Sequence, residues 1–163
     1  MTARYGSLAA LLLLVLAASF LAGRFEAGEW YVQALNKPSW MPAGFAWGVG
    51  WSLTWLFLAA GAWQVWQTGH YSRLAALAWW LLLLLLLVAW SLLFFGQHRV
   101  GWAWMELTAS LGVAVFCYRA FRPLSRPAAT LLLPAMLWLL FLWALNFWLW
   151  ATNGGLFSWF VTE

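Results

Sequence analysis

The stretch W-Y-V-Q-A-L-N-K-P-S-W-M-P-A-G-F-A-W-G-V-G-W-S-L-T-W-L-F-L-A-A-G, residues 30–61, changes character half-way along. Its first part is polar and contains Pro38 and Pro42, which bias the residues before them away from helical backbone angles. Its second part is an apolar run that carries Trp47, Trp51 and Trp55. These tryptophans are spaced to lie on one face of a helix. The stretch therefore predicts an aromatic loop leading into a tryptophan-lined helix, with Pro42 in its first turn.

The composition of the whole chain is that of a membrane protein. Of 163 residues, 66% are hydrophobic, 17 are Trp and only 7% are charged, against roughly 25% charged in ordinary soluble domains. The apolar runs are long, which favours helices over the short alternating strands of a barrel. The net charge of +4 forms no basic patch large enough for nucleic acid. We therefore expect an all-α integral membrane protein with the lipid bilayer as a partner and no nucleic acid.

Polar breaks divide the chain into five apolar segments long enough to span a bilayer. The segments cover residues 5–24, 42–66, 73–95, 102–121 and 128–151. The first segment has an alternative interpretation as a cleaved signal peptide, because its apolar core is short. We favour a membrane helix, since about twenty residues span the ~30 Å hydrocarbon core. The prediction is a five-transmembrane-helix bundle forming one domain over residues 1–163, with the polar connection 25–41 as its longest loop.

Basic residues near the helix ends predict the orientation of the bundle. The side that carries the N-terminus holds Arg4, Arg73, Arg119, Arg122 and Arg126. The opposite side holds Arg24, Lys37 and Arg99 together with three of the four carboxylates. Lys and Arg concentrate on the cytoplasmic side of membrane proteins. We therefore expect a cytoplasmic N-terminus, with the proline-containing loop and the C-terminus outside.

Catalytic and metal-binding motifs are absent from the sequence. Cys117 is the single cysteine, so it supports neither a disulfide framework nor a cysteine cluster. His70 and His98 fall in turns on opposite faces of the predicted bundle, which prevents a shared metal site. No serine, cysteine or lysine lies beside a histidine and a carboxylate in the manner of a catalytic group. We predict no metal site, no required cofactor and no acid–base catalytic machinery.

Several motifs along the chain resemble those of one known family. They are W-Y-x-x-x-L-N-K-P-S-W-x-P at 30–42, A-W-S-L-L-F-F-G at 89–96, G-W-A-W-M-E at 101–106, P-x-x-x-W at 134–138 and L-N-x-x-x-W at 145–150. In this order and spacing the chain resembles the TspO/MBR family of tryptophan-rich sensory proteins and translocator proteins over about residues 20–153.

The resemblance implies a function in ligand binding within the membrane. Family members are five-helix bundles, usually homodimers, and the first loop closes their pocket. They bind porphyrins such as protoporphyrin IX and haem, isoquinoline and benzodiazepine drugs, and in some cases cholesterol. Bacterial members resemble tetrapyrrole-linked stress regulators, which implies a bacterial inner membrane for this chain.

The resemblance also implies which residues form the site. The ligand-binding candidates are Trp40, Trp51, Trp55, Trp90, Trp102, Glu106, Trp138, Phe141 and Asn146. The lid candidates in the first loop are Lys37, Pro38, Trp40 and Pro42. Each group also has a structural interpretation: interfacial packing for the tryptophans, an internal hydrogen bond for Glu106, and contact between helices for Asn146.

Two departures from the family pattern stand out. Leu87 occupies a position where the family often has Asn, so one polar ligand contact is replaced by an aliphatic one. The end of the fifth segment, N-F-W-L-W-A at 146–151, lacks the Tyr and the following basic residue of a sterol motif. Such motifs are weak even when they are present. We therefore expect no specific sterol site at the end of the fifth helix.

Three functional hypotheses remain open from the sequence. The first is a membrane receptor or carrier that binds porphyrins in a pocket within the bundle and acts in tetrapyrrole-linked regulation or transport. The second is an enzyme that degrades porphyrin in light through Trp51 and Trp138, by electron or oxygen chemistry. The third is a structural or regulatory partner protein with a vestigial pocket, for which Leu87 is the supporting feature.

Overall fold

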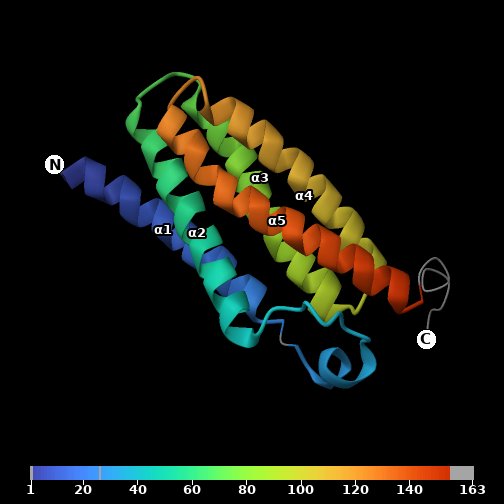
Figure 1. The fold of residues 1–163 in the computed structure, drawn as a ribbon. Coiled ribbons are helices and arrows are strands. Elements are labelled where there is room, and N and C mark those ends of the chain that lie inside the picture. The colour runs from blue at the N-terminus through green and yellow to red at the C-terminus, as the bar shows by residue number, and fades with distance from the viewer. Residues whose placement is uncertain (1, 26, 155–163) are drawn as a thin grey trace.

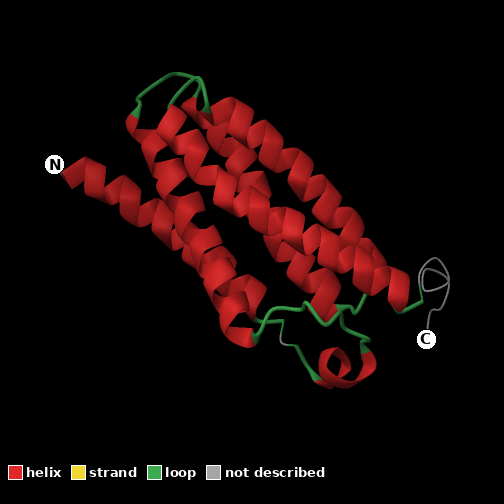
Figure 2. Cartoon of the chain, viewed as in Figure 1, coloured by secondary structure: helices red, strands yellow, loops and turns green. Residues whose placement is uncertain are grey.

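The computed structural model describes residues 2–25 and 27–154 and consists of helices joined by short connections (Figures 1 and 2). The long helices are α1 (Thr2–Gly23), α2 (Gly44–Gln67), α3 (Arg73–Ser91), α4 (Val100–Phe121) and α5 (Arg126–Thr152). Two five-residue π-helical turns, η1 (Trp30–Ala34) and η2 (Leu92–Gly96), lie in the first loop and after α3. Within the described residues, five helical segments are long and apolar enough to cross a membrane. The predicted all-α membrane fold is confirmed.

The helices pack as a bundle in which each contacts a defined set of neighbours. α4 packs against α3 and α5, α2 packs against α5, and α1 packs against α2 and α3. Figure 1 shows α1 diverging from the bundle toward its N-terminus and meeting the others near the first loop. The described part of the chain begins at the end where α2 joins α3, and α5 ends at the opposite end. This is the arrangement expected for five crossings.

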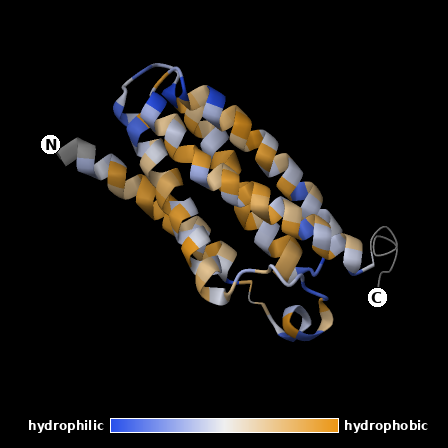
Figure 3. Cartoon of the chain, viewed as in Figure 1, coloured by the Kyte–Doolittle hydropathy of each residue, from blue (hydrophilic) through white to orange (hydrophobic). Residues whose placement is uncertain are grey.

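The interior of the bundle is packed with aliphatic and small side chains. Leu58, Leu107 and Leu142 are fully buried on α2, α4 and α5. Trp80 on α3 is also buried, and its Nε1 donates a hydrogen bond of 3.0 Å to the carbonyl of Leu58 on α2. Figure 3 shows apolar residues along the middle of the helices and hydrophilic residues at the turns. The hydrocarbon region of a bilayer demands this distribution, because unpaired polar groups are costly there.

Helix boundaries differ from the sequence prediction by a few residues. Pro42 was expected in the first turn of α2, but that helix begins at Gly44 and Ala43 is its N-cap. The extended backbone of Ala43, with ψ of 156°, keeps Pro42 outside the helix. α4 begins two residues earlier than predicted, and α5 begins at Arg126 because Ser125 caps it, its Oγ accepting from the Ala128 N–H at 3.2 Å.

The first loop is anchored to the bundle. Lys37 Nζ donates to the carbonyls of Tyr31 and Val32 in η1, the latter at 2.9 Å. It thereby satisfies carbonyl groups at a helix terminus that would otherwise lack partners. Leu35 and Pro38 are buried. The sequence did not predict the π-helical turn in this loop.

A pair of hydrogen bonds fastens the loop to the end of α5. The Asn36 N–H donates to Oδ1 of Asn153 at 2.7 Å, and Nδ2 of Asn153 donates to the Asn36 carbonyl at 3.0 Å. The contact uses the backbone of residue 36 but the side chain of residue 153. We call this pair the loop clasp.

Replacement of Asn153 by Ala should loosen the first loop, because both bonds of the loop clasp are lost. Each such bond contributes roughly 1 kcal/mol, so amide exchange at Asn36 should accelerate by about tenfold or more. Hydrogen–deuterium exchange of the loop peptide measures this effect. Asn36→Ala is the matched control, since it keeps the backbone groups and should exchange as the wild type does. Equal acceleration in both variants would contradict the role of the clasp.

Candidate functional site

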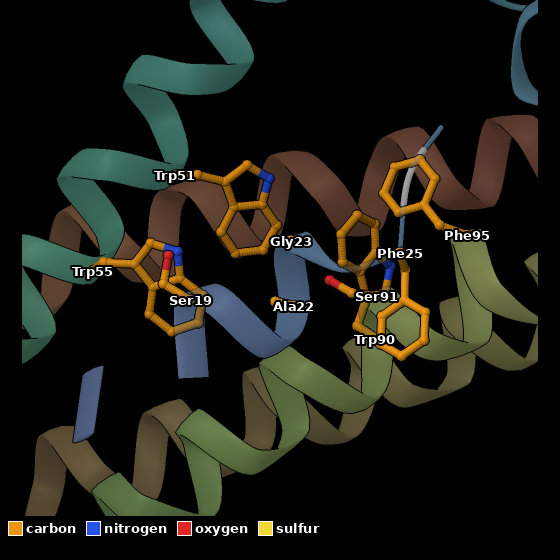
Figure 4. A pocket seen from close by; sticks show the side chains of 9 residues that line it. All are labelled: Ser19, Ala22, Gly23, Phe25, Trp51, Trp55, Trp90, Ser91 and Phe95. Carbon is orange, nitrogen blue, oxygen red and sulfur yellow. The ribbon is translucent and has the colours of Figure 1, made fainter. Parts of the chain in front are cut away.

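A cavity opens between α1, α2 and α3 near the first loop, with a volume of about 240 Å³. Nine residues line it: Ser19, Ala22, Gly23, Phe25, Trp51, Trp55, Trp90, Ser91 and Phe95. Figure 4 shows the two α2 tryptophans projecting from one wall, with α1 and the α3–η2 segment forming the others. The lining is mainly aromatic, and its polar side-chain groups are two serine hydroxyls and the indole N–H groups of the tryptophans. Such a surface suits a flat, largely apolar ligand.

Trp51 is the centre of the aromatic groups at this site. Its ring centroid lies 5.8 Å from that of Trp55, in a stacked arrangement, and 5.5 Å from that of Trp90. Trp138 of α5 meets Trp51 edge-on at 6.3 Å. Trp51 therefore connects the cavity wall of α2 to both α3 and α5.

Trp138 occupies a space that exists because residue 50 is glycine. A Cβ atom at Gly50 would lie 2.5 Å from the Trp138 ring, well inside van der Waals contact. Trp138 also stacks on Phe141 at 5.2 Å. Trp138 itself does not line the cavity, so it supports Trp51 from behind.

Trp40 and Phe141 lie together on the loop side of this cluster. Their ring centroids are 6.1 Å apart in an edge-on contact. Trp40 is 49% exposed, and neither residue lines the cavity. They extend the aromatic contacts of Trp138 to the first loop.

Trp90 and Asn146 form a buried polar link between α3 and α5. Both are 1% exposed. Trp90 Nε1 donates to Asn146 Oδ1 at 3.4 Å, and Asn146 Nδ2 donates to the Leu142 carbonyl at 3.0 Å. Asn146 thus holds the Trp90 ring at the cavity wall and does not itself line the cavity.

The α4 candidates are not brought to the cavity. Trp102 is 49% exposed, and neither Trp102 nor Glu106 belongs to the lining. Oε1 of Glu106 accepts a hydrogen bond of 2.7 Å from Ser110 Oγ, one turn along the same helix. Oε2 is buried without a hydrogen-bond partner among the described residues. The structure therefore shows the internal hydrogen bond that was one interpretation of Glu106.

Leu87 is fully buried and does not contribute to the cavity lining. It is part of the aliphatic core instead. A polar side chain at this position would need a partner within that core. Leu87, which stands where the family often has Asn, therefore packs within the aliphatic core.

The lid candidates contribute to the loop rather than to the cavity wall. Lys37 binds backbone carbonyls of η1 and lies 4.9 Å from the centre of the Tyr31 ring. Pro38 is buried, and Pro42 precedes α2. The loop reaches the cavity through Tyr31, whose ring lies 5.6 Å from that of the lining residue Phe95.

Sequence reasoning missed the contributions of α1 and of residues 25, 91 and 95. Ser19, Ala22 and Gly23 are small and line the cavity at the end of α1. The small residues that precede the first loop were the signal in the sequence that could have indicated this part of the lining. Gly96 admits the Phe25 ring, because a Cβ there would lie 2.9 Å from Phe25 Cδ1. Ser91 and Phe95 lie within the A-W-S-L-L-F-F-G motif already noted.

Candidate metal ligands do not gather in the described structure. No group of three or more His, Cys, Asp or Glu residues able to hold a metal occurs within residues 2–25 and 27–154. The ring of His98 instead stacks on that of Trp30, with centroids 4.3 Å apart. This places His98 against the first loop.

The fold and the cavity define an integral membrane protein with an aromatic pocket inside a five-helix bundle. The TspO/MBR family model matches residues 9–151, and the chain belongs to this family. The chain is 34% identical to the translocator protein of Homo sapiens over 151 residues, covering 83% of each chain. It is 30% identical over 149 residues to the tryptophan-rich protein TspO of Archaeoglobus fulgidus, covering 90% of this chain and 96% of that one. Family membership supports a tetrapyrrole-related receptor or transporter role in the membrane.

Replacement of Gly50 by Ala should displace Trp138 and destabilise the bundle. Overpacking of this kind costs about 1–3 kcal/mol, so the thermal midpoint of the detergent-solubilised protein should fall by several degrees. Gly48→Ala, on the same helix, is the control because nothing lies within 4 Å of its added Cβ. Its midpoint should stay unchanged or rise, since Ala favours helix. A Gly50→Ala midpoint equal to that of Gly48→Ala would refute the close packing of Trp138.

Proposed function

We propose that this protein is a membrane receptor or carrier that binds a porphyrin-type macrocycle, such as protoporphyrin IX or haem, in the α1–α2–α3 cavity. The observation that carries the proposal is the aromatic wall formed by Trp51, Trp55 and Trp90 around that cavity. Aromatic faces bind flat conjugated rings through dispersion and offset stacking. The buried Trp90–Asn146 hydrogen bond keeps one of these faces in place.

The size of the cavity indicates how a macrocycle would enter. Its volume of about 240 Å³ lies below the ~300–1,000 Å³ of typical ligand pockets. A porphyrin ring would therefore have to widen the site. Phe25 follows the C-terminus of α1, and α1 diverges from the bundle at its other end. In this proposal the α1–loop junction moves outward when the ligand binds.

Charged groups at the loop end suit the carboxylates of a porphyrin. Arg24 lies in the chain between the lining residues Gly23 and Phe25 and is exposed. A guanidinium pairs well with carboxylates. Lys37 is already occupied by the carbonyls of η1, so Arg24 is the better partner for a propionate.

Replacement of Trp51 by Phe should weaken binding of protoporphyrin IX in the dark by roughly threefold to tenfold, the loss expected for one aromatic contact. Titration of the detergent-purified protein by tryptophan fluorescence quenching measures the affinity. Trp138→Phe should weaken binding less, because Trp138 lies behind Trp51. Trp79→Phe is the matched control: Trp79 lies on α3, stacked on Phe116, outside the cavity.

Saturable quenching that weakens in Trp51→Phe and not in Trp79→Phe supports the pocket. Linear quenching that is equal in all variants would mean that the porphyrin only partitions into the micelle. That result would contradict the proposal and favour the vestigial-pocket hypothesis.

A second candidate function is light-dependent degradation of the bound porphyrin. The supporting observation is the direct contact of Trp51 with Trp55, Trp90 and Trp138, at centroid distances of 5.5–6.3 Å. Contacts of this kind offer a path for an electron between indoles and an excited pigment. Dioxygen would be the oxidant, and no acid–base group would be required.

Illumination of the complex tests this second function. The enzymatic hypothesis predicts that each protein molecule bleaches more than one equivalent of porphyrin, measured as loss of the Soret absorption band. The bleaching rate should be at least tenfold lower in the Trp51→Phe/Trp138→Phe double variant. The rate is compared at full occupancy, so that weaker binding does not mimic lost activity. Equal bleaching rates of free and bound porphyrin would contradict the enzymatic hypothesis and favour the receptor hypothesis.

A further inference from the structure

A second hollow lies at the opposite end of the bundle, at the turn between α4 and α5. Its volume is about 740 Å³. Tyr118, Ser125 and three arginines, Arg119, Arg122 and Arg126, line it together with part of the turn. Three guanidinium groups within eight residues of a chain that is only 7% charged concentrate much of its positive charge at one place.

These arginines have no acidic partner in the described structure. No ion pair is found for Arg119, Arg122 or Arg126 within residues 2–25 and 27–154. Glu106 lies thirteen residues before Arg119 on α4, which is about 20 Å along a helix. Glu29 belongs to the first loop, at the other end of the bundle. No carboxylate of the described residues therefore compensates the positive charge of this hollow.

A nearby arginine differs from these three because it has partners within the chain. Arg73 begins α3 at the same end of the bundle, but its Nη1 donates to the Trp66 carbonyl at 3.1 Å. Its guanidinium also lies 4.4 Å from the centre of the Trp66 ring. Arg73 is therefore used to close the α2–α3 turn. The three arginines of the α4–α5 turn are exposed and have no comparable role.

The backbone of the turn adds to the attraction for an anion. The N-terminus of the 27-residue helix α5 faces this turn, and a helix N-terminus carries partial positive charge. Ser125 Oγ accepts the Ala128 N–H, which leaves its own proton to donate outward. The paired N–H donors of an arginine guanidinium group match the geometry of phosphate oxygens. The hollow thus has the chemistry of a phosphate site.

The position of the hollow in the membrane-spanning bundle indicates which molecule would supply the phosphate. The turn joins two membrane-spanning helices, Val100–Phe121 and Arg126–Thr152, so it lies where lipid head groups lie. Basic pockets between transmembrane helices on the cytoplasmic side bind anionic lipid head groups. The basic excess at this end also predicts that it faces the cytoplasm. We propose that the α4–α5 hollow binds the phosphate of an anionic phospholipid.

The test is native mass spectrometry of the full-length protein in micelles doped with palmitoyl-oleoyl phosphatidylglycerol or phosphatidylcholine. The wild type should retain one phosphatidylglycerol in preference to phosphatidylcholine. At about fivefold per arginine, Arg122→Gln/Arg126→Gln should bind it about 25-fold more weakly. Arg99→Glu lowers the net charge by the same two units at the other end of the bundle and should bind phosphatidylglycerol as the wild type does.

Three outcomes would overturn the proposal. One is equal retention of phosphatidylglycerol by all three proteins, and another is an equal loss in both variants, which would mean attraction by net charge alone. The third is displacement of the lipid by millimolar inorganic phosphate, which would assign the hollow to a soluble anion. Circular dichroism and size-exclusion profiles identical to the wild type establish that both variants are folded. The proposal does not depend on porphyrin binding at the other end.

Discussion

The indole of Trp138 lies against the backbone of α2 at Gly50, and the aromatic site depends on this contact. Because residue 50 has no side chain, the ring of an α5 tryptophan reaches the same level as Trp51. Trp51 is then supported from behind by Trp138 and projects with Trp55 toward α1 and α3. A larger residue at position 50 would separate α2 from Trp138 and remove that support.

The membrane imposes the second constraint, since buried polar groups in this bundle need partners on the protein itself. The Trp90–Asn146 and Trp80–Leu58 hydrogen bonds each join two helices and satisfy indole N–H groups in the interior. Apart from Glu106 within α4, whose Oε1 accepts from Ser110, the charged side chains of the described residues lie toward the helix ends and in the connections. The two ends thus differ in chemistry: one carries the aromatic cavity and its loop, the other an uncompensated basic hollow.

The sequence predicted the helices well because their apolar runs are long and the breaks between them contain proline, glycine and charge. It could not predict which face of each helix points inward, since α2 and α3 are apolar all round and give no directional signal. Trp102 and Glu106 match family motifs, yet α4 packs against α3 and α5, and neither residue lines the α1–α2–α3 cavity. The role of α1 was missed for the same reason: Ser19, Ala22 and Gly23 acquire their place only through the packing of α1 on α2 and α3.

The central claim is that a ligand binds between α1, α2 and α3 against Trp51. A crystal structure of the protein with protoporphyrin IX tests it most directly. We expect the macrocycle in contact with Trp51, Trp55 and Trp90, with Phe25 displaced from its present position beside Gly96. A macrocycle bound instead on the outer aromatic cluster of α4 and α5, where Trp104 stacks on Trp150 at 5.4 Å, would contradict the account.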